Sequence, residues 1–319
     1  MYNIVIIGVG ALGKRHLQSI LNSKLELDIY CYDINEQVLD NFDWKDTNNI
    51  KKLTMVTSFS DLPKEVDFAL FAMTANGRRE TFDQLIEHCT VKHILFEKVL
   101  FQKIEDYEYV GQKLKELNIN AWVNCARRQM DCYQELKKEL ESAKEIRIFI
   151  SGGEWGMACN AIHEIDLIEF LSDSSETKID KLSLLPEIAD SKRKGFKEVY
   201  GTIDGHSGRC CHFSISCMKD SQVPDILTIS TDIGQYVIFE GKQKLIYMSI
   251  DNEYELLEKD FVMPYQSQMT QLVMEDILLT GKSRLAKFDV SSRLHLEFIR
   301  PLIEFFNNNG WEDESCPIT

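Results

Sequence analysis

The first sixteen residues constrain the fold of this chain more than any other stretch. Residues 3–7, Asn-Ile-Val-Ile-Ile, form the short apolar run that is typical of a buried parallel strand. The pattern Gly-Val-Gly-Ala-Leu-Gly follows at once over residues 8–13, and residues 14–21 are predicted to form a helix. A strand, a G-x-G-x-x-G loop and a helix in this order indicate a doubly wound α/β sheet that binds a dinucleotide.

Each glycine of the loop has a physical reason. Gly8 permits the tight turn, Gly10 lets the backbone approach a pyrophosphate, and Gly13 lets the helix pack on the strand. The first helical turn offers unpaired N–H groups and the positive end of the helix dipole to the phosphates. We therefore expect the cofactor to contact this turn, including Ala11 and Leu12.

A carboxylate completes the pattern. A second strand is predicted over residues 27–32, and Asp33 follows it, 20 residues after the last glycine. At that place an acidic side chain accepts hydrogen bonds from a ribose diol and repels a 2′-phosphate. The expected cofactor is therefore NAD, with NADP disfavoured. The alternative is a doubly wound domain that has lost its cofactor.

The alternation of strands and helices divides the chain. It continues to residue 122 and includes a helix expected over residues 36–42, so residues 1–122 are predicted to form a Rossmann domain with a parallel sheet. Residues 123–319 carry successive strand patterns with few helices, which predicts an α+β domain with a large, mostly antiparallel open sheet. The polar tail over residues 307–319 is expected to fray.

Polar residues follow two of the predicted parallel strands. Thr74 and Asn76 come after the strand predicted over residues 66–73, and Glu97 and Lys98 come after the next one. Ligands of open α/β sheets lie outside the carboxyl ends of the strands, so these residues are expected to contact the cofactor. An Asn-Gly turn and a solvated loop are the alternatives at the two places.

Bulk composition excludes several classes of protein. A length of 319 residues suggests two domains, and a net charge of −15 argues against a general binder of nucleic acids or anionic membranes. No segment approaches the apolar length of a membrane helix, and the first strand starts too early for a leader peptide. Nine cysteines without a C-x-x-C pair indicate reduced thiols and no zinc site. We expect a soluble, cytoplasmic protein.

The motifs together resemble those of the Gfo/Idh/MocA oxidoreductases, the family of glucose–fructose oxidoreductase and inositol dehydrogenase. The matching segments are Gly8–His16, the Glu97-Lys98 pair in the place of a Glu-Lys-Pro motif, Arg127-Arg128 followed by Tyr133, and Ala161–Leu167 with its His-x-x-Asp-Leu signature. They span most of the chain. A Rossmann domain followed by an open sheet is also the architecture of that family.

The resemblance implies a reaction. Enzymes of the family move a hydride between a nicotinamide ring and a carbon of a sugar or polyol, which implies an NAD(P)-dependent dehydrogenase or reductase acting on CH–OH groups. At the matching positions, Lys98 is expected to contact the reacting oxygen and His163 to act as general acid and base. Asp166 lies three residues further along the same helix face and is expected to orient His163 or contact substrate. A core histidine is the alternative for His163.

Other residues are expected to line the substrate pocket. Asn160 suits a substrate hydroxyl, Trp155 suits the face of a sugar ring, and Arg128 suits a phosphate or carboxylate. A core indole and a salt bridge between the domains are the alternatives for the last two. The sequence departs from the family at Val99, where the family has proline, and at Cys159, where many sugar dehydrogenases have aspartate.

Substrate and partners follow from these residues as expectations. The main hypothesis is hydride transfer to or from a phosphorylated or nucleotide-linked sugar, as in cell-surface carbohydrate metabolism. Because an acidic partner of His163 is missing at Cys159, a reductase of a non-sugar carbonyl or imine is an alternative. A non-catalytic NAD-binding sensor is another. One face of the antiparallel sheet needs no helix cover, so a homodimer or homotetramer through that sheet is expected.

Overall fold

The computed structural model describes residues 1–39 and 49–319, which form two compact units. The first unit comprises residues 1–124, 264–292 and 319, and the second comprises residues 125–263 and 293–318. The sequence placed all of residues 123–319 in the second domain. Residues 264–292 differ because they return to the first unit, where helix α6 (Gln266–Thr280) packs against helix α1 (Ala11–Ile20).

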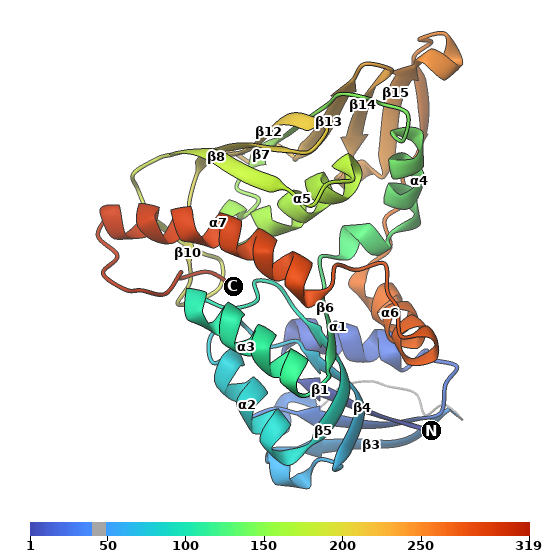
Figure 1. Cartoon of the computed structure of the whole chain (residues 1–319), viewed down its shortest axis with the longest axis vertical. Helices are drawn as coiled ribbons and strands as arrows, with labels where there is room; N and C mark the ends of the chain where they lie inside the picture. The colour runs from blue at the N-terminus through green and yellow to red at the C-terminus, as the bar shows by residue number, and fades with distance from the viewer. Residues whose placement is uncertain (40–48) are drawn as a thin grey trace. The chain divides into compact units, whose positions relative to one another are not determined.

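The first unit is built on a six-stranded parallel sheet with the strand order β3-β2-β1-β4-β5-β6 (Figure 1). This order is that of a doubly wound sheet, so the predicted Rossmann fold is confirmed. Its strands are β1 (Tyr2–Ile7), β2 (Leu27–Tyr32), β3 (Ile50–Val56), β4 (Glu65–Phe71), β5 (Thr90–Phe96) and β6 (Asn120–Val123). Its helices are α1 (Ala11–Ile20), α2 (Arg78–His88), α3 (Ile104–Glu116) and α6 (Gln266–Thr280).

Alternation along the strands explains the layers of the first unit. Successive side chains of a strand point to opposite faces, so Leu70 and Phe71 face different helices. Leu70 belongs to an apolar cluster that includes Leu17 of α1 and Ile277 of α6. Phe71 packs instead against Phe82 of α2. The helix predicted over residues 36–42 appears as one turn over Glu36–Leu39, and residues 40–42 lie outside the described residues.

The second unit is built on an eight-stranded sheet with the order β16-β15-β14-β13-β7-β12-β11-β8. All neighbours in it are antiparallel except β7 and β12, which confirms the mostly antiparallel prediction. The strands are β7 (Ile146–Gly153), β8 (Thr177–Leu184), β11 (Gly201–Ser207), β12 (Cys210–Met218), β13 (Ile226–Thr231), β14 (Gly234–Phe239), β15 (Lys244–Ser249) and β16 (Leu257–Asp260), beside a hairpin of β9 (Ala189–Asp190) and β10 (Lys197–Glu198). The helices are α4 (Asp131–Glu139) and α5 (Met157–Ser172), and α7 (Phe288–Asn308) enters this unit at residue 293.

Helix α5 covers one face of this sheet. Residues of β7 alternate between buried and exposed, so Ile148 faces α5 while Phe149 faces away. The helix has an almost wholly buried sequence, which is why its hydrophobic periodicity is weak. It begins four residues before the predicted Ala161, at Met157.

The C-terminal tail was expected to fray, but it is not frayed throughout. Residues 316–319 are buried, and the carbonyl of Pro317 accepts a hydrogen bond from the Lys197 N–H (2.7 Å). Helix α7 runs through Pro301 as one element. The burial of the tail reflects tertiary packing that a local pattern does not contain.

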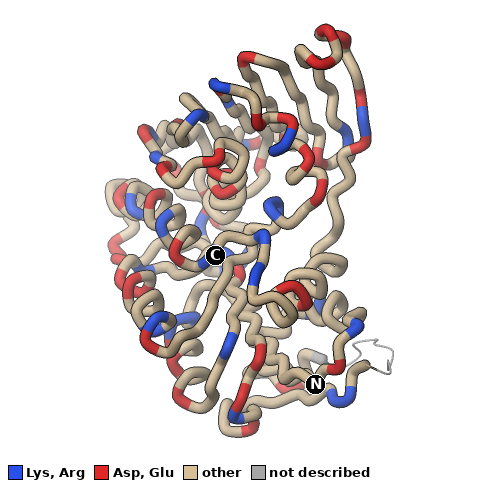
Figure 2. Tube along the Cα trace, turned by 45° about the vertical axis from the view of Figure 1, so that its right-hand side comes forward, with Lys and Arg blue, Asp and Glu red and all other residues tan. Residues whose placement is uncertain are grey.

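Charged residues and cysteines are distributed over both units. Figure 2 shows acidic positions spread along both units rather than gathered in one segment. All nine cysteines are free thiols. Among the described residues, no helix is long and apolar enough to cross a membrane.

Candidate functional site

The glycine loop has the geometry that close backbone packing requires. Gly8 has a φ of +86°, and a Cβ there would lie 2.7 Å from the backbone nitrogen of Met73. A Cβ on Gly13 would lie 2.1 Å from the carbonyl oxygen of Gly8, because α1 packs directly on the loop. A side chain at either position therefore overlaps backbone atoms.

Gly10 differs from the other two glycines. A Cβ on Gly10 would have no atom of the described residues within 4 Å, and its φ of −65° is open to any residue. Gly10 and Ala11 are exposed, and within residues 1–39 and 49–319 no side-chain hydrogen bond caps the N-terminus of α1. The loop therefore leaves open space in front of a helix N-terminus, which is the arrangement that receives a phosphate.

Asp33 is fixed to the same loop. Its Oδ2 accepts a hydrogen bond from the Val9 N–H (2.8 Å), and its Oδ1 accepts one from the Asn35 N–H (3.1 Å). A carboxylate oxygen has two acceptor positions, so each oxygen retains one for a ligand. The open space at Gly10, the uncapped helix and this oriented carboxylate fit a dinucleotide with a free ribose diol.

Thr74 and Asn76 lie in the loop that follows β4, and both side chains are exposed. Between them, the Ala75 N–H donates a hydrogen bond to Thr319 Oγ1 (2.8 Å). The two residues thus stand at the carboxyl edge of the parallel sheet, as the sequence places them.

Glu97 is buried in a polar network rather than exposed at the sheet edge. Its Oε1 lies 3.1 Å from His16 Nε2 and 2.5 Å from the Asn124 amide nitrogen. Burial alone would raise the pKa of Glu97, but His16, Asn124 and the charge of Lys98 together hold it below its ordinary value. Glu97 is therefore an ionised internal anchor for the loop that carries Lys98.

Sequence reasoning missed two partners in this network. His16 Nδ1 lies 2.8 Å from Thr270 Oγ1, and the Gln266 amide nitrogen donates to the same Oγ1 (2.9 Å). Both come from α6, which the sequence assigned to the other domain. His16 is the last residue of the Gly8–His16 motif, and this position was the sequence feature that could have indicated its role.

Lys98 follows Glu97 and is half-buried, and the next residue, Val99, is fully buried. The peptide bond between them is cis. Lys98 belongs to the first unit, and His163 belongs to α5 of the second.

Helix α5 and the strands beneath it position the second set of predicted residues. His163 and Asn160 are half-buried on α5. The Asn160 amide donates to the Trp155 carbonyl (3.0 Å), and the Trp155 indole N–H donates to the Ser216 carbonyl (2.9 Å) on β12. Trp155 and Asn160 are thus joined to each other and to the sheet.

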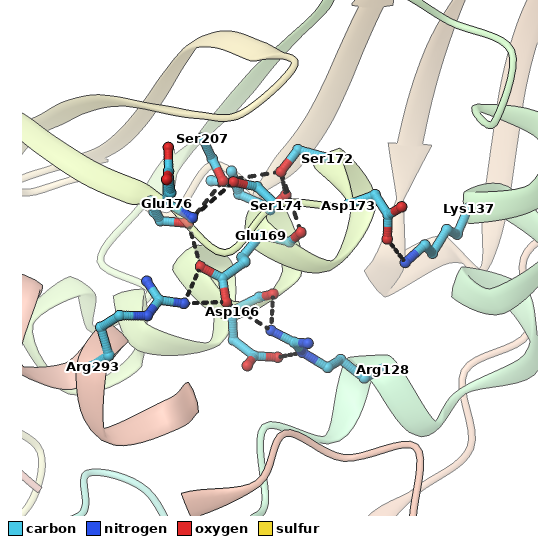
Figure 3. A network of polar contacts seen from close by, with 12 residues as sticks. Arg128, Lys137, Asp166, Glu169, Ser172, Asp173, Ser174, Glu176, Ser207 and Arg293 are labelled. Carbon is cyan, nitrogen blue, oxygen red and sulfur yellow. Dashed lines mark hydrogen bonds and ion pairs between the residues drawn. The ribbon is translucent and has the colours of Figure 1, made fainter. Parts of the chain in front are cut away.

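Asp166 and Arg128 are brought together, as Figure 3 shows. Arg128 donates from Nε to Asp166 Oδ2 (2.7 Å) and from Nη2 to the Asp166 carbonyl (3.1 Å). Burial raises the pKa of Asp166, and Arg128 opposes that effect. The carboxylate that the sequence places beside His163 is therefore paired with Arg128. This ion pair lies within the second unit, whereas the alternative for Arg128 in the sequence was a salt bridge between the domains.

Glu169 extends this network by one helical turn (Figure 3). Both of its oxygens lie 2.7 Å from Arg293 Nη2, and its Oε2 accepts a hydrogen bond from Thr177 Oγ1 (2.7 Å). The network thus ties α5 to α7 and β8. It is an internal arrangement that sequence spacing did not indicate.

Arg127 lies in a second buried network. It makes a bidentate pair with Glu240, with distances of 2.7 and 2.8 Å, and it lies 2.9 Å from Glu164 on α5. Tyr133 donates its hydroxyl to the same Glu240. The guanidinium of Arg127 therefore forms ion pairs with two carboxylates, those of Glu164 and Glu240.

The two carboxylates differ in their pKa values. Burial raises the pKa of Glu164 to about 7, with Arg127 opposing this and Glu240 adding to it. Burial also acts on Glu240, but Arg127 and Tyr133 hold its pKa below the ordinary value. Glu240 is thus the ionised partner of Arg127, and Glu164 titrates near neutral pH.

Glu164→Gln is expected to flatten the dependence of stability on pH. A carboxyl with a raised folded-state pKa stabilises the fold below its unfolded pKa and loses that contribution as pH rises through the folded pKa. The wild-type chain should therefore lose about 2–3 kcal/mol more than the variant between roughly pH 4.5 and 7. Urea unfolding at several pH values measures this difference. Parallel curves for the two chains would contradict it.

Comparison with known proteins supports the fold. No family model and no curated protein matches the sequence. Among solved structures, an oxidoreductase from Agrobacterium radiobacter, in complex with NAD+, L-tartaric acid and magnesium, has a TM-score of 0.71 at 14% identity, and the match covers 96% of both chains. The UDP-N-acetylglucosamine 3-dehydrogenase from Acidithiobacillus ferrooxidans has a TM-score of 0.67 at 12% identity over 92% of this chain and 94% of that one.

A regulator has the same fold. The transcriptional regulator Gal80p from Kluyveromyces lactis has a TM-score of 0.69 at 15% identity over 96% of this chain and 90% of its own. At these identities the likeness shows the fold alone. The chain has the two-part fold of these oxidoreductases and of this regulator, which is the fold that the motifs predicted.

Proposed function

We propose that this protein is an NAD-dependent oxidoreductase that transfers hydride to or from a sugar or sugar derivative. The observation that carries the proposal is the open space at Gly10, before an uncapped helix and beside the oriented Asp33 carboxylate. Two neighbours in fold support it, since one was solved with NAD+ and the other is a UDP-sugar dehydrogenase.

The first unit supplies the residues that would hold the cofactor. Backbone N–H groups of Ala11 and Leu12 would bind the pyrophosphate at the start of α1, and Asp33 would bind the ribose diol and disfavour NADP. Thr74 and Asn76 would contact the cofactor from the loop after β4. When bound, the nicotinamide ring supplies or accepts the hydride.

Residues of this chain would handle the substrate and its proton. Lys98 would hydrogen-bond the reacting oxygen through its ammonium group, and His163 would take up or return the hydroxyl proton. Asn160 would bind a further hydroxyl, and Trp155 would lie against the ring. Arg128 uses Nε and Nη2 on Asp166, so its Nη1 would be the group that meets a substrate phosphate.

We propose a cytoplasmic homo-oligomer that pairs through the exposed face of the eight-stranded sheet. That face carries exposed or half-exposed residues of mixed polarity, among them Arg147, Phe149 and Met218. A second copy of the chain would cover it without a helix layer.

A non-catalytic NAD-binding sensor is the second candidate. It is favoured by the pairing of Asp166 with Arg128, which removes a carboxylate from the chemistry expected at His163. Gal80p, a transcriptional regulator of the same fold, supports it further.

Lys98→Met is expected to separate these candidates. The variant should retain NADH affinity and lose about 100-fold or more in turnover, because the charge on the reacting oxygen is no longer stabilised. Purified protein is assayed for NADH oxidation and NAD+ reduction on a panel of nucleotide sugars, sugar phosphates and free polyols.

Lys103→Met, a change at an exposed lysine five residues after Lys98, is the matched control and should keep wild-type turnover. Turnover by Lys98→Met at the wild-type rate would show that Lys98 has no catalytic role. Binding of NADH without turnover on any substrate would favour the sensor.

A further inference from the structure

Arg78, the first residue of α2, is fully buried and donates hydrogen bonds to four main-chain carbonyl groups. Its Nη1 shares two N–H groups among the carbonyls of Glu97 (2.6 Å), Leu100 (2.8 Å) and Val99, and its Nη2 donates to that of Met73. None of the motifs in the sequence singled it out.

These four carbonyls belong to the two loops that carry the proposed site. Met73 directly precedes Thr74 in the loop after β4, and the other three flank or follow Lys98 in the loop after β5. Because β4 and β5 are neighbours in the parallel sheet, one side chain spans both loops at the carboxyl edge.

We propose that Arg78 is a positioning residue that sets the Lys98 loop against the cofactor loop. The proposal rests on the proposed function of Lys98. A guanidinium is a rigid planar fork with five donors, so it holds several acceptors at fixed relative places. Removing it leaves up to four buried carbonyls without their donor, which favours movement of both loops.

The hydrogen bonds of Arg78 act as a clamp on the Lys98 loop, and the residue after Lys98 explains why the loop needs it. Val99 has no ring that fixes its φ, and its carbonyl is instead held by Arg78. The loop is anchored again at Phe101, whose N–H and carbonyl both pair with the Tyr107 hydroxyl (3.2 and 2.8 Å). Between the Glu97 network and Phe101, Arg78 therefore supplies the contacts that fix the main chain.

The test compares Arg78→Met and Arg78→Lys with a matched control, Arg79→Met. Arg79 is the next residue of the same helix, and it is partly exposed and pairs with Asp83 (2.7 Å). The first variant removes all the donors, the second keeps the charge without the fork, and the control removes an arginine from the same helical turn.

Two measurements on the ligand-free protein, hydrogen exchange and lysine acetylation, report directly on the clamp. Hydrogen exchange of the segment 97–101 should accelerate about tenfold or more in Arg78→Met, while residues 90–96 of β5 keep their wild-type rates. The rate of Lys98 acetylation by acetic anhydride, followed by mass spectrometry across pH, should rise and its pH profile should shift. Arg78→Lys should recover little of either property, and Arg79→Met should match the wild type.

NADH titration and turnover complete the test. In Arg78→Met, turnover should fall at least about tenfold more than NADH affinity does, because the lysine is displaced more than the glycine loop. Wild-type exchange and labelling of Lys98 in Arg78→Met would overturn the clamp and leave the proposed function standing. Failure of the wild-type chain to bind NADH would instead overturn the proposed function, while exchange and labelling would still decide whether Arg78 fixes the loop.

Discussion

Gly10→Val is expected to keep the fold and to weaken NADH binding by about 100-fold or more, which corresponds to roughly 2.7 kcal/mol. A Cβ at Gly10 meets no atom of the described residues within 4 Å beyond its chain neighbours, and the backbone there is in a conformation open to valine. It projects instead into the space where the pyrophosphate would approach the main chain. The measurement is a fluorescence titration with NADH beside a thermal melt.

Gly13→Ala is the control, because it is expected to destabilise the fold, which Gly10→Val should not do. Its Cβ would lie 2.1 Å from the Gly8 carbonyl, so the variant should lose several degrees of melting temperature. Equal melting and undiminished NADH affinity in Gly10→Val would show that the cofactor does not lie on this loop.

Arg127→Met is expected to destabilise the second unit by about 3–5 kcal/mol. Among the described residues, Arg127 is the cation that pairs with both Glu164 and Glu240, so the variant removes the charge that opposes the burial of both carboxyl groups. The loss should shrink in acid, where the carboxylates protonate.

The matched control is Lys51→Met, which removes an exposed lysine paired with an exposed Glu26 in the first unit. Such a surface pair contributes little, so the control should unfold within about 0.5 kcal/mol of the wild type. Urea unfolding of the three chains gives the comparison. Equal losses for the two variants would show that the Arg127 network does not stabilise the fold.

Local pattern was sufficient for most of the fold. Buried parallel strands such as residues 66–73 are apolar except for Asp67, and the glycine loop carries its own geometry, so both are visible in the sequence. Strand β11 is not evident from composition, because its Asp204-Gly205 pair is typical of a turn although both residues pair within the sheet. The return of α6 to the first unit depends on contacts with α1 that no local pattern contains.

The parts of the candidate site that belong to a local motif could be predicted from the sequence. Pairs of side chains that come from distant segments could not. Gly10 precedes α1, and Asp33 follows β2 and accepts a hydrogen bond from the Val9 N–H, so a turn and a strand end set their positions. The pairing of Arg128 with Asp166 joins residues 38 positions apart, and its existence depends on how α5 packs. Arg78 was invisible for the same reason, since its acceptors are carbonyl groups that carry no sequence signal.

The central claim is that the first unit binds NAD(H). Titration of the purified wild-type chain with NADH, and in parallel with NADPH, tests it most directly, with nucleotide fluorescence as the signal. We expect saturable NADH binding and an affinity for NADPH at least about tenfold weaker, because Asp33 repels a 2′-phosphate. Binding of neither nucleotide, or tighter binding of NADPH, would contradict it.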